Sequence, residues 1–451
     1  MNTQKMTNYR WVVCSLLFVA TFVNYMDRQV LSITAPDYIV KEFGWTNDSY
    51  GNITAWFSIF YAVCMLFAGR FVDWLDTKKG FLWAIGIWSV GACLHALVGI
   101  VTAGWISGEW IFSFEGASDI LKTVSDTGMI VNISVTLFIF SRFVLALGEA
   151  GNFPAANKAT SEFFPKKDRA YATSIYNAGS TIGAMIAPLS IPFLAQAWGW
   201  ELSFIIIGAL GFLWMGFWVL IYDKPDKHPK VNAVELEYIL SDSEPAQTNV
   251  KKDKVSFIQC FKYRQTWAFA FGKFMTDGVW WFYLFWMPKY LKDVYGLTWE
   301  RPLEDPRAML AIFVLYGIVM LSLIGGWLPS HFIKKGMNPY AGRMKAMLIF
   351  AFFPLLALLA QPLGEYTFWV PVIIVGIAGA AHQSWSANIF STVGDMFPKK
   401  AIATITGIGG MAGGVGSYII NKSSGKLFDY ASGSTKIVTD GVEKIIPMTK
   451  D

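Results

Sequence analysis

Long apolar runs constrain this chain more than any other feature of its sequence. Eleven of them occur, near residues 11–36, 52–72, 81–104, 133–155, 171–195, 202–222, 266–287, 308–328, 345–361, 367–391 and 401–421. A helix that crosses roughly 30 Å of hydrocarbon needs about 20 such residues. Of all 451 residues, 54% are hydrophobic and only 15% are charged, which is too apolar for an ordinary soluble domain. The sequence therefore predicts an all-α, polytopic membrane protein.

The remaining residue types give little support to an enzyme. The first apolar run carries two charges and is too long for the core of a cleavable signal, so we expect it to be retained. The four cysteines and four histidines are scattered, without the spacing of a disulfide framework or a metal site. HExxH, GxSxG and phosphate-binding loops are missing from the sequence. We therefore expect no metal and no cofactor, and an integral membrane enzyme is the disfavoured alternative.

The distribution of Lys and Arg predicts the orientation. The N-terminus and every second loop after it together carry 22 of these residues, whereas the intervening loops carry 6. Basic loops are retained on the cytoplasmic side of a membrane. The N-terminus is therefore predicted to be cytoplasmic. The net charge of +5 follows from this asymmetry and does not indicate nucleic-acid binding.

An internal repeat divides the chain into two halves. "FFPKKDRAYAT" at Phe163 is echoed by "MFPKKAIATIT" at Met396, and "DTKKG" is echoed by "FIKKG", each at the same place within its half. The prediction is an N-terminal six-helix bundle over 1–222, a cytoplasmic linker over 223–265 and a C-terminal bundle over 266–451. A twelfth helix should follow residue 421, but the polar tail has no adequate apolar run. The tail is interpreted as a truncation or, alternatively, as the external tail of an eleven-helix protein.

Ionisable residues inside the predicted spans indicate function, because a charge at the centre of a spanning helix costs about 3 kcal/mol. The residues concerned are Asp27, Arg28, Arg142, Glu149, Lys273 and Asp277. Arg28 can hold a substrate carboxylate with its guanidinium fork, and Asp27 and Glu149 can change protonation state. The competing interpretation is that these groups pair across helices only to fix the packing. Lys273 and Asp277 have the i, i+4 spacing of an ion pair on one helix.

Polar and aromatic residues on the apolar helices suggest a site for a hydroxylated solute. Tyr61, Asn177 and the run "HQSWSAN" from His382 to Asn388 supply hydrogen-bonding groups. The candidate aromatic rings are Trp280, Trp281, Tyr283 and Trp385. The glycine-rich stretches at 177–188 and 406–418 predict close helix packing or, equally, a gating role.

Several motifs together resemble the anion:cation symporters of the major facilitator superfamily. They include "NYMDRQVLS", "GRFVDWLDTKKG", "SRFVLALGEAGNFPAANKATSEFFPKKDRA" and "YNAGSTIGAMIAP", and "FMTDGVWWFYLFWMPKYL" and "GGWLPSHFIKKG" further resemble the bacterial hexuronate transporters. The resemblance implies a fold of two pseudo-symmetric six-helix bundles. It also implies import of a sugar acid, glucuronate or galacturonate, with a proton across the bacterial inner membrane, by a monomer in the lipid bilayer.

The resemblance assigns roles to particular residues. Arg28 would bind the substrate carboxylate beside Tyr61. Asp27 and Glu149 would be the proton-coupling acids, with Arg142 as electrostatic partner of Glu149. The remaining substrate ligands would be Asn177, Trp280, Gln383, Ser386 and Asn388. Another organic anion, such as an aldonate or aldarate, is the alternative substrate, because Arg28 reads only a carboxylate.

The chain departs from the family pattern in the loop after the second span. The usual signature has a glycine where this chain has Asp76, and the equivalent acid of the second half is replaced at Ser330. We therefore expect a salt-bridge gate at this level only in the N-terminal half.

Overall fold

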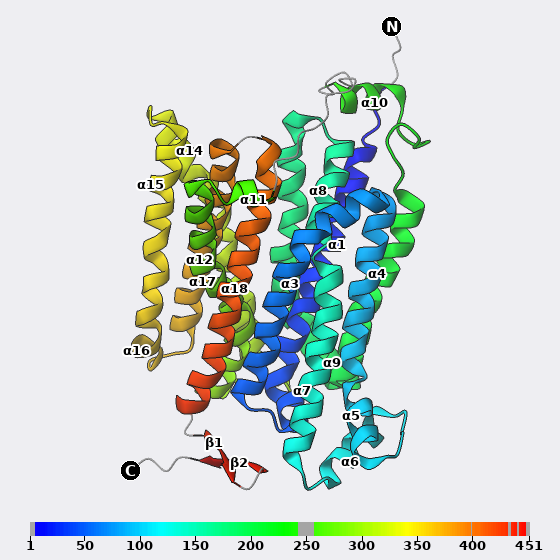
Figure 1. Cartoon of the computed structure of the whole chain (residues 1–451), viewed down its shortest axis with the longest axis vertical. Coiled ribbons are helices and arrows are strands. Elements are labelled where there is room, and N and C mark those ends of the chain that lie inside the picture. Colours follow the sequence, from blue (N-terminus) through cyan, green and yellow to red (C-terminus); the bar gives the residue numbers. More distant parts are fainter. Residues whose placement is uncertain (1–4, 242–256, 398, 432–433, 440–441, 448–451) are drawn as a thin grey trace.

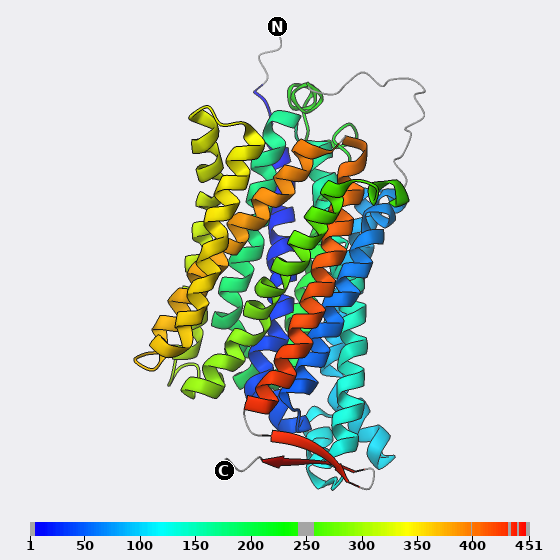
Figure 2. The same cartoon turned by 60° about the vertical axis from the view of Figure 1, so that its left-hand side comes forward.

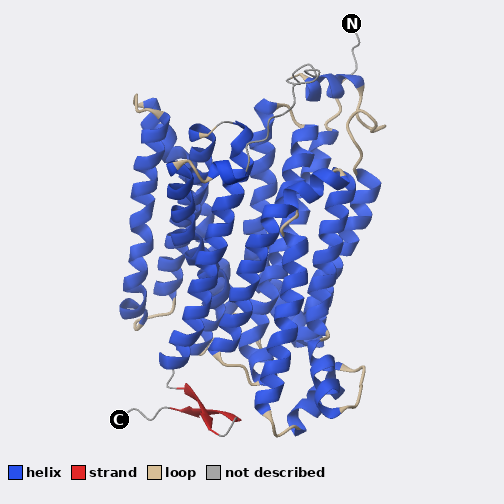
Figure 3. Cartoon of the chain, viewed as in Figure 1, coloured by secondary structure: helices blue, strands red, loops and turns tan. Residues whose placement is uncertain are grey.

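The molecule is a bundle of long helices that run in the same general direction (Figures 1 and 3). The computed structural model describes residues 5–241, 257–397, 399–431, 434–439 and 442–447. The start of α1 and the helices α10 and α11, which lie between α9 and α12 in the sequence, are at one end of the bundle, which we call the linker face. The strands β1 and β2 and the loop containing α6 lie at the opposite end, the hairpin face (Figures 1 and 2).

The N-terminal helices, α1 to α9, come before the linker. Their bounds are α1 Tyr9–Thr34, the π-helical turn η1 Ala35–Ile39, α2 Val40–Phe43, α3 Asn47–Leu75, α4 Thr77–Ala96, α5 Val98–Ser107, α6 Phe114–Thr123, α7 Thr127–Glu149, α8 Asn152–Phe163 and α9 Lys166–Ile221. α9 contains two predicted spans that join at Gly199, whose φ of 88° and ψ of 161° break the helix. The linker holds α10 Ala233–Leu240 and α11 Phe257–Cys260.

The C-terminal helices, α12 to α18, follow the linker. Their bounds are α12 Arg264–Tyr295, α13 Arg307–Val319, the 3₁₀ turn η2 Met320–Gly326, α14 Trp327–Lys334, α15 Pro339–Phe352, the 3₁₀ turn η3 Phe353–Leu359, α16 Ala360–Gly364, α17 Trp369–Met396 and α18 Lys399–Ala431. The strands β1 Ser434–Thr439 and β2 Val442–Pro447 then form an antiparallel hairpin in which Ser434 is opposite Pro447.

All eleven predicted apolar runs lie in helical structure. Within the described residues, seven helices are long and apolar enough to cross a membrane, or eight if α4 and α5, bent by 48°, form one span. The described part of the tail holds no further spanning helix, although the symmetry of the two halves would require a twelfth. α18 instead continues to Ala431, and the hairpin follows it.

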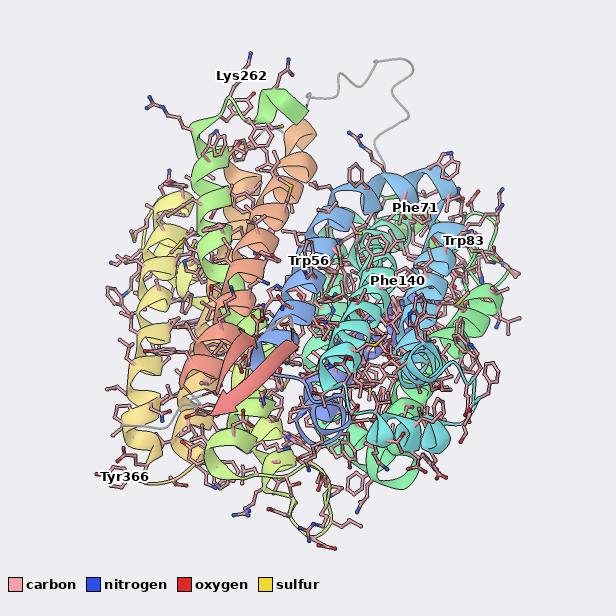
Figure 4. The ribbon with its side chains drawn as sticks, turned by 60° about the horizontal axis from the view of Figure 1, so that its bottom comes forward. Trp56, Phe71, Trp83, Phe140, Lys262 and Tyr366 are labelled. Atoms are coloured by element: carbon pink, nitrogen blue, oxygen red, sulfur yellow. The ribbon has the colours of Figure 1, made fainter. Side chains whose placement is uncertain are left out.

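Large apolar side chains cover the outside of the bundle. Trp83 of α4 and Phe140 of α7 are 60% and 55% exposed and lie on its outer surface (Figure 4). Exposed apolar surface of this extent would be unfavourable in water but is expected where helices face lipid. The fold is therefore that of a multi-pass membrane protein.

Glycines let the helices approach closely within the bundle. A Cβ atom added to Gly183 of α9 would lie 2.4 Å from the carbonyl oxygen of Phe22 in α1. A Cβ atom on Gly414 of α18 would lie 2.1 Å from the Cβ of Ala62 in α3. Both glycine-rich stretches of the sequence therefore lie at close helix contacts, as small residues do in membrane bundles.

Polar contacts join the N-terminal and C-terminal helices at the hairpin face. Asp37 of η1 accepts a hydrogen bond from the backbone N–H of Trp299 at 2.6 Å and forms an ion pair with Lys292. Lys41 of α2 pairs with Glu300. These contacts close the hairpin face between the two groups of helices.

Candidate functional site

Arg28 forms a buried ion pair with a residue far away in the sequence. Its Nε donates to Oε2 of Glu149 at 2.7 Å, and the two residues are 2% and 0% exposed. Arg28 lies in the second half of α1, whereas Glu149 is the last residue of α7. A buried ion pair of this kind is a strong constraint on geometry, because removing either partner leaves an uncompensated charge.

Aromatic rings surround the guanidinium of Arg28. Its Cζ atom lies 4.5 Å from the ring centre of Tyr61, 4.9 Å from that of Tyr25 and 5.2 Å from that of Trp281. These distances are within the range of cation–π attraction. We call these three rings the aromatic cage. Because Trp281 belongs to α12, a C-terminal helix completes the aromatic cage. One guanidinium nitrogen, Nη2, is buried without a hydrogen-bond partner among the described residues.

Tyr61 therefore lies beside Arg28, as predicted. Of the candidate aromatic rings, Trp281 contacts Arg28, and Trp280 has no described contact with it. Tyr25 was not among the predicted site residues. Its position three residues before Arg28 places it on the same helix face, and this spacing could have identified it.

Arg142 and Asp27 are buried charges that have no ion-pair partner among the described residues. Arg142 is 1% exposed and lies 5.1 Å from the ring centre of Phe57. None of its three side-chain nitrogens, and neither carboxylate oxygen of Asp27, has a hydrogen-bond partner among the described residues. Arg142 interacts electrostatically with Glu149, but the ion-pair partner of Glu149 is Arg28.

The C-terminal residues predicted to bind substrate lie on α12 and α17. The ring of Trp280 stacks on that of His382, with centroids 6.2 Å apart. Asn388 is buried and donates its side-chain N–H groups to the carbonyl oxygens of Ser384 and Gly325, at 2.8 Å and 3.1 Å. Gln383 and Ser386 are half-buried. None of these four predicted residues has a described contact with Arg28.

Asn177 is exposed on α9 and takes no part in the described contacts around Arg28. Lys273 and Asp277 form the ion pair that their spacing predicts, with Nζ and Oδ1 2.6 Å apart. The packing alternative therefore describes these two residues well, because each charge is satisfied within α12.

A contact that sequence reasoning missed links the two groups of helices next to Arg28. Nε2 of Gln29 donates to the hydroxyl of Tyr316 in α13 at 2.8 Å, and Oε1 of Gln29 accepts from Ser32 at 2.7 Å. All three side chains are buried. Only the adjacency of Gln29 to Arg28 could have drawn attention to it.

A multi-pass helical bundle that buries an arginine where two groups of helices meet is typical of secondary membrane transporters. Comparison with known proteins agrees with this class. The chain belongs to the Major Facilitator Superfamily, whose family model matches residues 17–420. This finding confirms the family resemblance predicted from the motifs, and it places the chain among transporters, not enzymes.

Several relatives are named as transporters of sugar acids. The hexuronate transporter of Escherichia coli (strain K12) is 28% identical over 430 residues, covering 94% of this chain and 89% of the relative. The galacturonate transporter of Dickeya chrysanthemi is 27% identical over 330 residues, covering 73% of this chain and 84% of the relative. A probable galactarate/D-glucarate transporter of Escherichia coli (strain K12) is 24% identical, covering 92% and 87%.

Solved structures share the fold at low sequence identity. A bacterial homologue of the human lysosomal transporter Spinster, in an inward-facing and unoccupied conformation, has a TM-score of 0.68 at 18% identity, covering 95% of this chain and 84% of that one. A D-xylose–proton symporter has a TM-score of 0.61 at 14% identity, covering 92% and 90%. These likenesses concern the fold alone.

Proposed function

We propose that this protein imports a hexuronate, glucuronate or galacturonate, together with a proton. The observation that carries the proposal is the ion pair of Arg28 with Glu149 inside an aromatic cage to which both groups of helices contribute. Relatives named as hexuronate and galacturonate transporters support the substrate class. The protein would work in a bacterial inner membrane, as a monomer with its N-terminus in the cytoplasm.

The ion pair suggests how a proton and a carboxylate become coupled. While Glu149 is charged, it occupies Nε of Arg28, and a substrate carboxylate must compete with it for the guanidinium. Protonation of Glu149 weakens its hold and releases the fork for bidentate binding of the substrate. Each ligand then favours the other by the same coupling free energy. Asp27, buried nearby, is the second proposed proton-coupling acid. The positive charge of Arg142 acts electrostatically on both Asp27 and Glu149.

The sugar hydroxyls would be bound mainly by the C-terminal helices. We assign this role to Trp280, Gln383, Ser386 and Asn388, with Asn177 from α9. Asn388 already donates to two backbone carbonyls, so it would offer a hydroxyl only its side-chain oxygen. The two halves, 1–222 and 266–451, would rock against each other about the substrate site, so that the site opens to each side of the membrane in turn.

A dicarboxylate is the second candidate, since one relative is named as a probable galactarate/D-glucarate transporter. Such a substrate has a second carboxylate that needs a second cation. Lys273 of α12 is already paired with Asp277, and Arg142 lies among the N-terminal helices, where we assign it to proton coupling. The single free guanidinium edge of Arg28 therefore favours a monocarboxylate.

Uptake by membrane vesicles tests the proposal. Radiolabelled galacturonate and glucuronate are supplied with an inward proton gradient, and again after a protonophore has collapsed it. We expect accumulation that depends on the gradient and is inhibited more by unlabelled hexuronates than by galactarate. Accumulation that is insensitive to the protonophore would exclude proton symport. Preferential transport of galactarate would show that the substrate is a dicarboxylate and not a hexuronate.

Replacing Arg28 tests the binding role directly. Arg28→Ala should weaken hexuronate binding by roughly tenfold to a hundredfold, because a charge-assisted hydrogen bond contributes about 1.5–3 kcal/mol. Arg28→Lys keeps the charge but loses the fork and should recover only part of the affinity. Binding is measured by isothermal titration calorimetry, with Arg307→Ala, an exposed arginine, as the matched control. Wild-type affinity in Arg28→Ala would place the substrate carboxylate elsewhere.

A further inference from the structure

Several buried polar atoms without a hydrogen-bond partner come from the N-terminal helices that hold Arg142. Within the described residues, these atoms include both oxygens of Asp27, Nε2 of His95 and Oε1 of Glu149, three groups that interact electrostatically with Arg142. They come from α1, α4 and α7, of which α4 and α7 pack tightly together. Buried polar groups in native proteins are almost always satisfied by protein atoms or ordered water.

His95 presents a hydrogen-bond acceptor to this region in a fixed orientation. Its Nδ1 lies 2.7 Å from the carbonyl oxygen of Gly91, so Nδ1 carries the proton and Nε2 keeps its lone pair. The imidazole stacks on Phe204 with ring centroids 4.8 Å apart and an angle of 2° between the planes. The edge of Phe138 packs against it at 5.5 Å. His95 is 0% exposed, so Nε2 cannot reach bulk solvent.

Arg142 lies among several possible acceptors and contacts none of them. It interacts electrostatically with Glu149, Tyr50, Asp27 and Arg28, and His95 in turn feels the charge of Arg142. The guanidinium has five N–H donors that must be satisfied. If they were satisfied by Asp27 or Glu149 directly, the charge of Arg142 would oppose protonation of these acids.

We propose that the polar atoms around Arg142 form a hydrated chamber, in which His95 accepts water-mediated hydrogen bonds that hold Arg142 away from Glu149 and Asp27. His95 is thereby a positioning residue for proton coupling, and the chamber borders the substrate site at Glu149, whose Oε2 pairs with Arg28. The inference rests on the proposed function and adds to it the group that sets the distance of Arg142 from the coupling acids.

The test compares three proteins in vesicles: the wild type, His95→Phe, which keeps the stacking but lacks the acceptor, and His95→Gln, which restores an acceptor oxygen. Two rates of galacturonate movement are measured for each: proton-driven uptake as a function of pH, and counterflow exchange without a proton gradient. In His95→Phe, Arg142 should move towards the acids and favour their charged forms, so the midpoint of uptake should shift by about one unit to lower pH. Counterflow should persist, and His95→Gln should return the midpoint towards that of the wild type.

The controls separate this inference from the proposed function. His331→Phe, a histidine on α14 outside the chamber, should leave the midpoint unchanged, and His95→Met replaces His95→Phe if the latter does not fold in a thermal unfolding assay. An unshifted midpoint in the apolar variants, with the wild type driven by protons, would overturn the role of His95 alone. Loss of counterflow in a folded variant would also overturn it, because His95 would then serve substrate binding or the conformational cycle. Wild-type uptake that ignores the proton gradient would defeat the proposed function and this inference together.

Discussion

At the scale of single residues, Asp76 shows how this chain departs from its family. It has φ 69° and ψ 159°, a backbone region that almost only glycine adopts, and the family motif has glycine there. The side chain compensates by capping α4 through the N–H of Thr77 at 2.9 Å and by pairing with Lys224 at 3.0 Å. The hydrogen bond from Lys224 lowers the pKa of Asp76. Its stabilising contribution is therefore present above the ordinary carboxyl pKa and lost as the pH falls through the lowered value.

Asp76→Gly should raise the free energy of unfolding by about 1 kcal/mol. Relief of backbone strain gains roughly 1–3 kcal/mol, whereas exchanging an Asp cap for glycine costs only a few tenths, and an exposed ion pair contributes at most about 1 kcal/mol. Thermal unfolding in detergent measures the effect. Asp76→Ala is the control, because it loses the cap and keeps the strain, so it should be less stable than the wild type. If Asp76→Gly were no more stable than Asp76→Ala, the backbone at this position would not be strained.

At the scale of elements, the N-terminus of α3 is capped by α18. The carboxylate of Asp429 accepts from the backbone N–H of Asn47 at 2.9 Å and of Asp48 at 2.8 Å. A carboxylate at this position also interacts favourably with the helix dipole. Tyr50, one turn later, donates to the carbonyl oxygen of Phe285 in α12 at 2.7 Å. Closure of the hairpin face therefore uses two backbone N–H groups at the N-terminus of α3 as its contact.

Asp429→Ala should weaken this closure. The two charge-assisted hydrogen bonds exist only in the closed arrangement, and each contributes about 1.5–3 kcal/mol. Their loss therefore destabilises the closed arrangement relative to the open one. The open population should rise by roughly tenfold or more. Spin labels on Ser125 and Lys426, both exposed near the hairpin face, would report longer distances by double electron–electron resonance. Asp429→Asn keeps one acceptor oxygen, so its distance distribution should lie between those of the wild type and Asp429→Ala. An unchanged distance distribution in Asp429→Ala would show that the cap does not contribute to closure.

At the scale of the whole molecule, the arrangement of the helices puts the basic loops on one face. The linker, with α10 and α11, and the ends of α8 and α14 all lie at the linker face (Figure 1). The acidic loop with α6 lies at the hairpin face. The bundle thus carries the charge asymmetry that predicts a cytoplasmic N-terminus.

Cysteine labelling tests this orientation. A cysteine replacing Lys227 in the linker should react with a membrane-impermeant maleimide only in inside-out vesicles. A cysteine replacing Leu303, which is 78% exposed between α12 and α13, should react only in right-side-out vesicles. The native cysteines are buried or half-buried, and a protein in which they are replaced by serine gives the background. The reverse labelling pattern would invert the topology.

The sequence alone determined the class of fold, because hydropathy acts over about 20 consecutive residues and needs no tertiary contact. It also located the charges that membrane burial makes costly, Asp27, Arg28, Arg142 and Glu149, and the ion pair of Lys273 with Asp277, which one helix turn brings together. Only the tertiary structure decided that Glu149 pairs with Arg28, 121 residues away. It also decided which of the candidate rings, Trp281, covers the guanidinium of Arg28, and that Arg142 has no hydrogen-bond partner among the described residues. Such pairings depend on how helices distant in sequence rotate and pack, which local periodicity does not specify. For the same reason the hairpin at 434–447 was not foreseen: the polar tail excluded a spanning helix but did not specify what replaced it.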